Sequence, residues 1–235
     1  MVDVGGKTYN VFSKNAATML DRTERRRAWD RAHQEKPVSG QPAEAVVAFA
    51  THLRSTLPPG APILDAGCGR GRNARYLSQA GFTTYGCDLS PVAVAVASAS
   101  AKASCAPVAY QVADLTFLPY VDNVFAAGVC VHVLPYHFIA NIVKGVQELW
   151  RVLRPGGWLY LDLLHGDDAE YGCGRELEAN TFLDPDGVPI HFTSRQEADE
   201  LLRGFAVQRM SRLELGARPR VAWLVWARKE EGKRR

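Results

Sequence analysis

An acid and three glycines near residue 65 are the residues of the chain whose types and spacing best suit ligand binding. Gly67, Gly69 and Gly71 allow positive φ angles, and they let backbone N–H groups approach a ligand without a Cβ clash. The apolar residues before Asp65 predict a buried strand, and Asn73 with the residues after it predicts the start of a helix. A glycine turn between a strand and a helix is typical of α/β proteins that bind nucleosides.

Two more acids follow predicted strands farther along the chain. Asp88 ends a strand predicted at residues 85–87, and Asp114 follows a strand predicted at residues 108–112. The carboxyl ends of parallel strands meet at one edge of a sheet, so we expect both acids to lie near the glycine turn. Carboxylates there would accept hydrogen bonds from hydroxyl and amino groups of a ligand.

The glycine spacing distinguishes between two kinds of nucleoside site. A dinucleotide-binding turn usually has the pattern G-x-G-x-x-G and holds a pyrophosphate at the helix N-terminus. Here the pattern is G-x-G-x-G, and Arg72 follows it. Asp65 stands at the entrance of the turn, where it would repel a phosphate. It would suit a ligand with a cationic part, such as an amino group beside a sulfonium.

These features together resemble motif I of the class I S-adenosylmethionine (SAM) methyltransferases, in the variant with Asn73 after the glycines. The resemblance implies a Rossmann-like, doubly wound α/β fold whose seven-stranded sheet is mostly parallel with one antiparallel strand. It also implies SAM as cofactor and S-adenosyl-L-homocysteine as product, with Asp88 on the ribose and Asp114 on the adenine amino group. The cofactor-binding residues that we predict are Asp65, Gly67, Cys68, Gly69, Asn73, Asp88, Leu89, Asp114, Leu115, Cys130 and Trp29.

The N-terminal part narrows the resemblance. Trp29-Asp30, and Pro42-Ala43-Glu44 before an apolar helix, resemble small-molecule methyltransferases of the tellurite-resistance and thiopurine type, in which the N-terminal segment closes over the cofactor. The alternative is a solvated helix with Trp29 packed on the domain. We expect a cap segment at 1–42, a methyltransferase domain at 43–228 with a lid insertion at 165–192, and a basic tail at 229–235.

The predicted elements alternate between strand and helix up to residue 204, and an antiparallel pair of strands follows. Helices are predicted at 22–34, 43–57, from 73 to before Gly81, and at 92–103, 138–153 and 193–202. Strands are predicted at 62–64, 85–87, 108–112, 124–131, 158–164, 205–215 and 221–228. The insertion at 165–192 is predicted to be irregular.

Three side chains are candidates to act on the acceptor. His132 follows the strand at 124–131, Tyr136 comes shortly after it, and His191 lies at the end of the insertion. Methyl transfer is an in-line displacement that depends mainly on alignment, and a base helps only where the acceptor must lose a proton. We therefore predict these residues as candidate catalytic groups, with packing, pocket lining or surface placement as the alternatives.

Two departures from the family pattern leave other functions open. Relatives often carry an Asp just after the Phe of the strand at 124–131 and a pair of adjacent histidines after it, where this chain has Ala126 and Val133. A catalytically silent SAM-binding partner subunit is therefore one alternative. A nicotinamide-dependent oxidoreductase is a second, less favoured one, because the glycine spacing and Asp65 argue against it.

Composition limits the partners that we expect. The chain has 235 residues, 47% hydrophobic residues and a net charge of +3, which is too small to indicate nucleic acid. It also lacks the Asn/Asp-Pro-Pro-aromatic run that holds a flipped base. We expect a small-molecule acceptor, no nucleic acid and a monomer or homodimer.

The compartment and the absence of a metal are also expectations. The five cysteines form no C-x-x-C pair, and Asp167-Asp168 lacks a matching set of acids, so no metal is expected. An odd number of cysteines suggests reduced thiols in the cytoplasm. Met1–Tyr9 has no apolar signal-like run, and no apolar run approaches the roughly eighteen residues of a membrane span, so no secretory signal and no membrane partner are expected.

Overall fold

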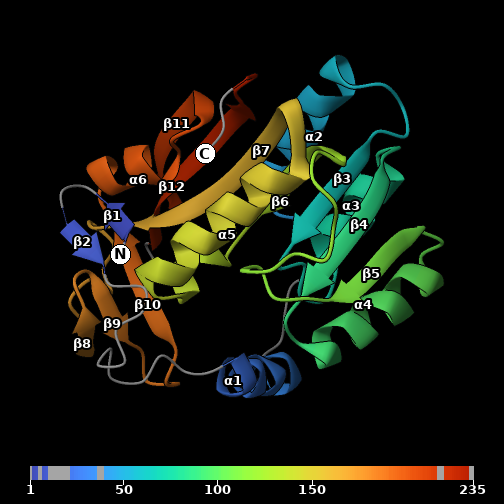
Figure 1. Cartoon of the computed structure of the whole chain (residues 1–235). Helices are drawn as coiled ribbons and strands as arrows, with labels where there is room; N and C mark the ends of the chain where they lie inside the picture. Colours follow the sequence, from blue (N-terminus) through green and yellow to red (C-terminus); the bar gives the residue numbers. More distant parts are fainter. Residues whose placement is uncertain (1, 5–6, 10–21, 36–39, 216–219, 233–235) are drawn as a thin grey trace.

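The computed structural model describes residues 2–4, 7–9, 22–35, 40–215 and 220–232. In these residues a large twisted sheet is covered by helices on both faces (Figure 1). The helices over one face are α2 (Glu44–Thr56) and α3 (Arg72–Gln79), and those over the other are α5 (Ile139–Val152) and α6 (Arg195–Leu201). α4 (Pro91–Ala103) packs beside the strands at one edge of the sheet.

The central part of the sheet has seven strands, of which one runs against its neighbours. In spatial order they are β5 (Val108–Val112), β4 (Thr83–Asp88), β3 (Pro62–Ala66), β6 (Phe125–Cys130), β7 (Leu153–His165), β12 (Arg220–Lys229) and β11 (Phe205–Leu215). β12 is antiparallel to both β7 and β11, and the other neighbouring pairs are parallel. The predicted doubly wound sheet with one antiparallel strand is therefore confirmed.

The core lies on both faces of the sheet because the central strands are buried on both sides. In β7, Leu159 and Leu161 pack under α5, whereas Tyr160 between them packs on the opposite face. There Tyr160 contacts Phe49 of α2, with ring centroids 5.7 Å apart. Each large apolar side chain buried in this way stabilises the fold by about 1.5–3 kcal/mol.

Local capping determines where several helices begin. Ser90 accepts a hydrogen bond from the first turn of α4, and Ser194 and Glu197 form a reciprocal capping box at α6. The N-cap residue of α5 makes no side-chain cap. Instead, Glu178 from the inserted segment accepts a 2.7 Å hydrogen bond from the Ile139 N–H. The insertion is thus built into the start of α5.

The insertion is not irregular, and that prediction was wrong. It contains β8 (Arg175–Glu178) and β9 (Thr181–Leu183) and runs into β10 (Pro189–Thr193), and together they form an antiparallel extension. β6 pairs with β7 only as far as Leu161, and β10 pairs with β7 from Leu164 onward. The unpaired end of β7 is completed by β10. The β8–β10 extension therefore projects beyond the carboxyl edge of the sheet.

The two ends of the chain hold smaller elements. β1 (Val2–Val4) pairs with β2 (Lys7–Tyr9), and α1 (Arg22–Glu35) packs beside α4 (Figure 1). Most of the predicted cap at 1–42 outside these elements is not among the described residues. No helix in the described ranges is long and apolar enough to cross a membrane.

The predicted basic tail begins later than expected. Lys229 is the last residue of β12, and its buried Nζ donates 2.7 Å hydrogen bonds to Asn123 Oδ1 and the Leu153 carbonyl. The ammonium also lies 3.9 Å from the centroid of the Trp150 ring. These partners stabilise the buried ammonium group. Composition alone would place this lysine in a solvated tail. Residues 233–235 lie outside the described residues.

Candidate functional site

The glycine turn after β3 is tied to the end of β4. The N–H groups of Gly67 and Cys68 donate to the Cys87 carbonyl at 2.8 and 2.9 Å. Gly67 has a φ of 74°, and a Cβ at this position would overlap the side chain of Val133. A glycine is therefore required both by the backbone angle and by the close packing of the turn after β6.

Asp88 connects the glycine turn to α4. Its carboxylate accepts hydrogen bonds from the N–H groups of Gly69 (2.8 Å) and Ser90 (2.9 Å). Burial raises the pKa of Asp88, and the Ser90 N–H, the charge of His33 and the Gly69 N–H partly offset that effect. Each carboxylate oxygen keeps a lone pair that can accept a further hydrogen bond from a ligand.

Asp114 is held by its own turn and by α1. Its Oδ1 accepts from the N–H and the hydroxyl of Thr116, and its Oδ2 accepts a 2.9 Å hydrogen bond from Arg25. Burial pushes the pKa of Asp114 upward, but Thr116 and the Arg25 guanidinium outweigh it and keep the pKa below its usual value. The Arg25 side chain is only 10% exposed, so the ion pair is largely shielded from water.

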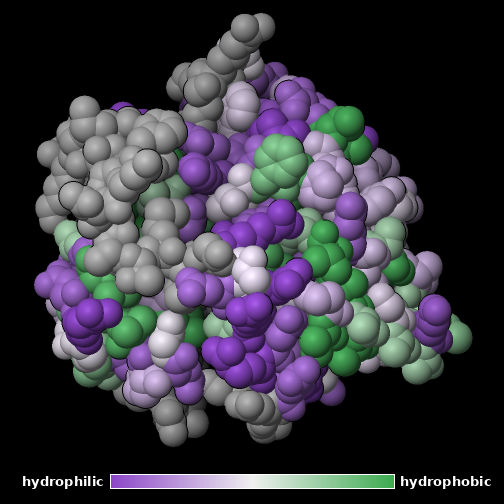
Figure 2. All heavy atoms as spheres, turned by 60° about the horizontal axis from the view of Figure 1, so that its bottom comes forward, coloured by the Kyte–Doolittle hydropathy of each residue, from purple (hydrophilic) through white to green (hydrophobic). Residues whose placement is uncertain are grey.

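Further contacts hold α1 across the carboxyl edge of the sheet (Figure 1). Asp30 accepts a 2.5 Å hydrogen bond from the Ser90 hydroxyl, and Arg70 donates to the carbonyl of His33. Trp29 packs edge-on against Tyr136, with ring centroids 5.6 Å apart. The surface around α1 is mainly hydrophilic, in keeping with the run of charged residues on this helix (Figure 2).

A small cavity of about 90 Å³ lies between α1 and the strand ends. It brings together most of the predicted cofactor residues with one candidate catalytic residue: Trp29, Gly67, Gly69, Asp88, Leu89, Asp114, Leu115 and His132. His33, Cys87, Ala113, Val133 and His137 also line it, and these were not predicted as cofactor residues. They come from α1, from the ends of β4 and β5, and from the segment between β6 and α5.

The remaining predicted cofactor residues lie outside this lining. Asp65 is buried, and burial raises its pKa to about 7. Cys68 and Cys130 are buried thiols whose pKa values are also raised by burial. Asn73 accepts a 3.0 Å hydrogen bond from the Ala43 N–H, so in this structure its side chain joins α3 to the start of α2.

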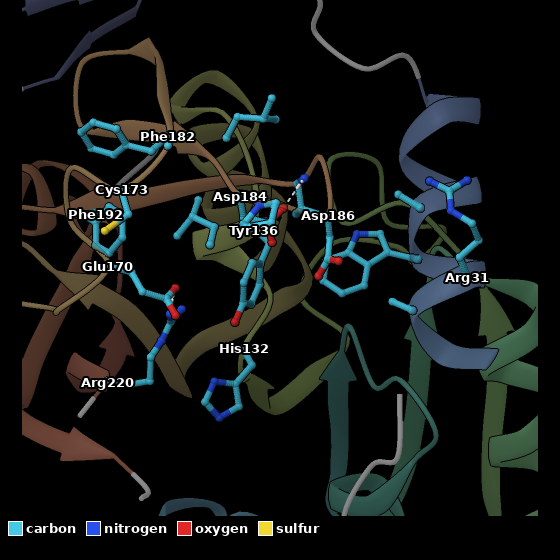
Figure 3. A pocket seen from close by; sticks show the side chains of 18 residues that line it. Arg31, His132, Tyr136, Glu170, Cys173, Phe182, Asp184, Asp186, Phe192 and Arg220 are labelled. Carbon is cyan, nitrogen blue, oxygen red and sulfur yellow. Dashed lines mark hydrogen bonds and ion pairs between the residues drawn. The ribbon is translucent and has the colours of Figure 1, made fainter. Parts of the chain in front are cut away.

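A larger cavity of about 880 Å³ adjoins α1, the turn after β6 and the β8–β10 extension (Figure 3). Its volume is in the range of about 300–1,000 Å³ that small-molecule sites occupy. Tyr136, Phe182 and Phe192 supply aromatic walls. On one side Glu170 and Arg220 point toward one another and form an ion pair.

The three candidate catalytic residues are placed differently. His132 lines both cavities, and Tyr136 lines the larger one. His191 is fully buried and is not among the lining residues of either cavity. Its Nδ1 is 2.8 Å from the Thr181 hydroxyl, and its Nε2 is 3.8 Å from Glu197. These contacts join the β8–β10 extension to α6.

We expect His191 to make the stability of the fold sensitive to acid. Burial lowers the pKa of His191 from 6.5 to about 4, with Glu197 opposing the shift. Between these two pH values the unfolded chain binds a proton that the folded chain does not, so stability falls as the pH falls. Each unit by which folding lowers this pKa corresponds to about 1.4 kcal/mol in the free energy of unfolding.

The test compares wild type with His191→Gln by urea denaturation at neutral pH and near pH 5. The wild type should lose more free energy of unfolding on acidification than the variant does, so the difference between the two proteins should narrow. A difference that stays constant across this pH range would contradict the assignment.

Comparison with known proteins gives the class of the domain. Residues 64–161 match the family model described as "Methyltransferase domain". An uncharacterised methyltransferase of Bacillus subtilis is 35% identical over 102 residues, which is 43% of this chain and 42% of that protein. A malonyl-[acyl-carrier protein] O-methyltransferase of Pectobacterium atrosepticum is 34% identical over 98 residues, 42% of this chain and 36% of that one. The matches thus span less than half the length of these relatives.

Solved structures share the fold over most of the chain. A SAM-dependent methyltransferase from Methanosarcina mazei superimposes with a TM-score of 0.68 at 23% identity, over 76% of this chain and 97% of that one. Magnesium protoporphyrin IX methyltransferase from Synechocystis, with bound S-adenosylhomocysteine, gives 0.67 at 20% identity, over 89% and 100%. Residues 64–161 therefore match a methyltransferase domain, and the chain has the fold of SAM-dependent methyltransferases.

Proposed function

We propose that this chain is a SAM-dependent methyltransferase that transfers a methyl group to a small-molecule acceptor. The observation that carries the proposal is the meeting of two cavities at His132. One is lined by the glycine turn and by Asp88 and Asp114, and the other is larger and walled by aromatic side chains. The family match at residues 64–161 supports the reaction class.

The residues of the smaller cavity fit SAM by their chemistry. Asp88 keeps lone pairs for the ribose hydroxyls, and Asp114 with Leu115 suits the adenine amino group. Asp65 lies outside the cavity lining, but its buried Oδ2 has no hydrogen-bond partner among the described residues and can accept a bond from the cationic amino group. When bound, SAM supplies an electrophilic methyl group.

A volume of about 90 Å³ is too small for a nucleoside, so we propose that α1 moves outward for SAM to enter. Arg25 and Asp30 are the side chains through which α1 holds Asp114 and Ser90. Closure over bound SAM would then exclude water and align the acceptor. This role of the N-terminal segment supports the predicted likeness to tellurite-resistance and thiopurine-type enzymes.

The larger cavity supports a small acceptor in preference to a polynucleotide. It is concave, and its cover consists of α1 and the β8–β10 extension, which we propose as cap and lid. The described cysteines are all free thiols, which supports a reducing compartment such as the cytoplasm.

Binding of SAM should change the fluorescence of Trp29. This indole lines both cavities, whereas Trp158 and Trp226 pack in the core cluster beside α2. We expect saturable quenching or enhancement with SAM, a matching heat in calorimetry, and loss of the optical signal in Trp29→Phe. NADH in place of SAM is the comparison that tests the oxidoreductase alternative.

Catalysis needs a separate assay. The isolated chain should form S-adenosyl-L-homocysteine with at least one member of a panel of thiols, phenols, amines and carboxylates. SAM binding without any transfer would favour the silent partner subunit. Absence of SAM binding, or tighter binding of NADH, would contradict the proposed function itself.

A further inference from the structure

A buried carboxylate on the neighbouring strand holds His132. Asp162 lies in β7 and is only 2% exposed. Its Oδ1 accepts a 2.7 Å hydrogen bond from the His132 backbone N–H, and its Oδ2 lies 3.3 Å from Nδ1 of the same imidazole. A single carboxylate thus contacts both the backbone and the ring of the residue at which the two cavities meet.

The backbone of His132 is unusual. Its backbone φ is 57°, in the left-handed region that residues other than glycine rarely adopt. Strained residues of this kind persist where the surroundings hold them, and they cluster at functional sites. The hydrogen bond that the His132 N–H donates to Asp162 holds this backbone in place. The His132 side chain remains 49% exposed, so the ring is fixed on one side and open on the other.

We infer that Asp162 and His132 form a proton-accepting pair, and that the acceptor presents a neutral hydroxyl whose proton this pair removes. The inference rests on the proposed function and names the substrate class for it. A carboxylate beside Nδ1 keeps the proton of the neutral ring on Nδ1, which leaves the lone pair on Nε2. Nε2 is then the atom that can accept a proton from the acceptor.

In this methyl transfer one bond to the methyl carbon forms as another breaks. The acceptor oxygen forms a bond to the methyl carbon, and the bond between that carbon and the cofactor sulfur breaks with its electron pair remaining on sulfur. The hydroxyl proton passes to Nε2 of His132, and the Asp162 carboxylate stabilises the imidazolium. The proton then leaves to solvent.

The larger cavity favours a hydroxyl acceptor over an anionic one. Its lining holds the acids Glu170, Asp184 and Asp186 against the bases Arg31 and Arg220. Arg220 is paired with Glu170, and the three acids outnumber the two bases, so the lining has no net positive charge to attract a substrate carboxylate. A carboxylate acceptor is ionised at neutral pH and needs no base, whereas a phenol with a pKa of about 10 does. The aromatic walls suit a planar phenolic ring.

Other titratable groups surround the pair. Arg72 from α3 acts on Asp162 and favours its ionised form. The charge of Asp162 in turn raises the pKa of Cys130 in β6 and of Tyr136, both of which lie near the same strand ends. Burial raises the pKa of Asp162, and the charge of His132 is the largest influence that opposes this rise.

The first test is spectroscopic and needs no acceptor. In ¹⁵N NMR spectra of the free protein at about pH 8.5, where histidines are neutral, the His132 ring should carry its proton on Nδ1. Asp162→Asn keeps an oxygen for the His132 N–H and turns an amide N–H toward Nδ1, so the proton should move to Nε2. The ¹⁵N signals that disappear in His132→Asn are those of the His132 ring. Asparagine is the replacement because it tolerates the left-handed backbone.

The second test uses phenol and thiophenol derivatives with the same ring. Asp162→Asn should lower kcat with the phenols by about 10²–10⁴-fold, with smaller changes for the thiols, for KM and for SAM affinity. Asp122→Asn, which changes an exposed aspartate that pairs with Arg151, is the matched control.

The two readouts separate the possible failures. An unchanged tautomer, or an equal loss with thiols and phenols, would show that Asp162 only holds the turn. Transfer to carboxylates but not to hydroxyls would overturn the substrate class. If Asp162→Asn does not fold, His132→Asn should show the same selective loss with phenols. Absence of SAM binding in the wild type would instead count against the proposed function.

Discussion

Replacement of Asp88 by alanine should weaken SAM binding by about 1.5–3 kcal/mol for each ribose hydrogen bond that is lost. If both hydroxyls are bound, the dissociation constant should rise by roughly 10²–10⁴-fold. The expected effect is large because Asp88 is partly buried at the carboxyl end of β4, where a bound ligand would shield its hydrogen bonds from water. Calorimetric titration with SAM measures the change.

Asp88 also has a structural role that the experiment must separate from binding. Its carboxylate holds the N–H groups of Gly69 and Ser90, so alanine loosens the glycine turn and the start of α4. Asp88→Asn keeps the shape of the side chain and should give an intermediate loss. Asp122→Ala, on an exposed aspartate, serves as the control. Unchanged SAM affinity in a folded Asp88→Ala protein would disprove the ribose assignment.

Removal of β8 and β9 should abolish most turnover while leaving SAM binding nearly intact. A short Gly/Ser link in place of residues 172–187 deletes β8 and β9 and a large part of the wall of the larger cavity. Loss of alignment by about 1 Å can cost roughly 10²-fold in rate, and loss of the whole wall should cost at least that much. Single-turnover assays with an identified acceptor measure it.

A point variant separates acceptor contact from stability, because the trimmed protein also loses the Glu178 contact at the start of α5. Phe182 lines the larger cavity and packs against Phe192, with ring centroids 6.0 Å apart. Phe182→Ala should raise KM or lower kcat, whereas Phe117→Ala, on a ring that is 79% exposed, should do neither. Full turnover in the trimmed enzyme would place the acceptor on the edge from His132 to Tyr136 instead.

The sequence by itself determined most of the individual strands of the sheet and the glycine turn, because each of these depends on residues that are neighbours along the chain. The buried strands β3, β6 and β7 have apolar runs bounded by turn residues, and the predicted antiparallel strand is β12. The spacing of Gly67, Gly69 and Gly71 predicts backbone angles, and all three φ values are positive. Local sterics and periodicity are sufficient for such features.

Only the tertiary structure decided which side chains meet at the edge of the sheet. Arg25 and Asp114 are 89 positions apart, and His132 and Asp162 are 30 apart. Their contacts depend on the order of the strands and on where α1 lies, which no local pattern encodes. For the same reason Asn73 was predicted at the cofactor but bonds to Ala43, whose position is set by the packing of α2.

The insertion and the end of β12 show the same limit. β10 forms a strand because β7 extends beyond β6 and leaves backbone groups unpaired there, and that overhang exists only after the sheet has assembled. Lys229 is buried because Asn123 and the Leu153 carbonyl converge on its ammonium. Burial of a charged or polar group is favourable only when distant partners satisfy it, so the three-dimensional arrangement decides it.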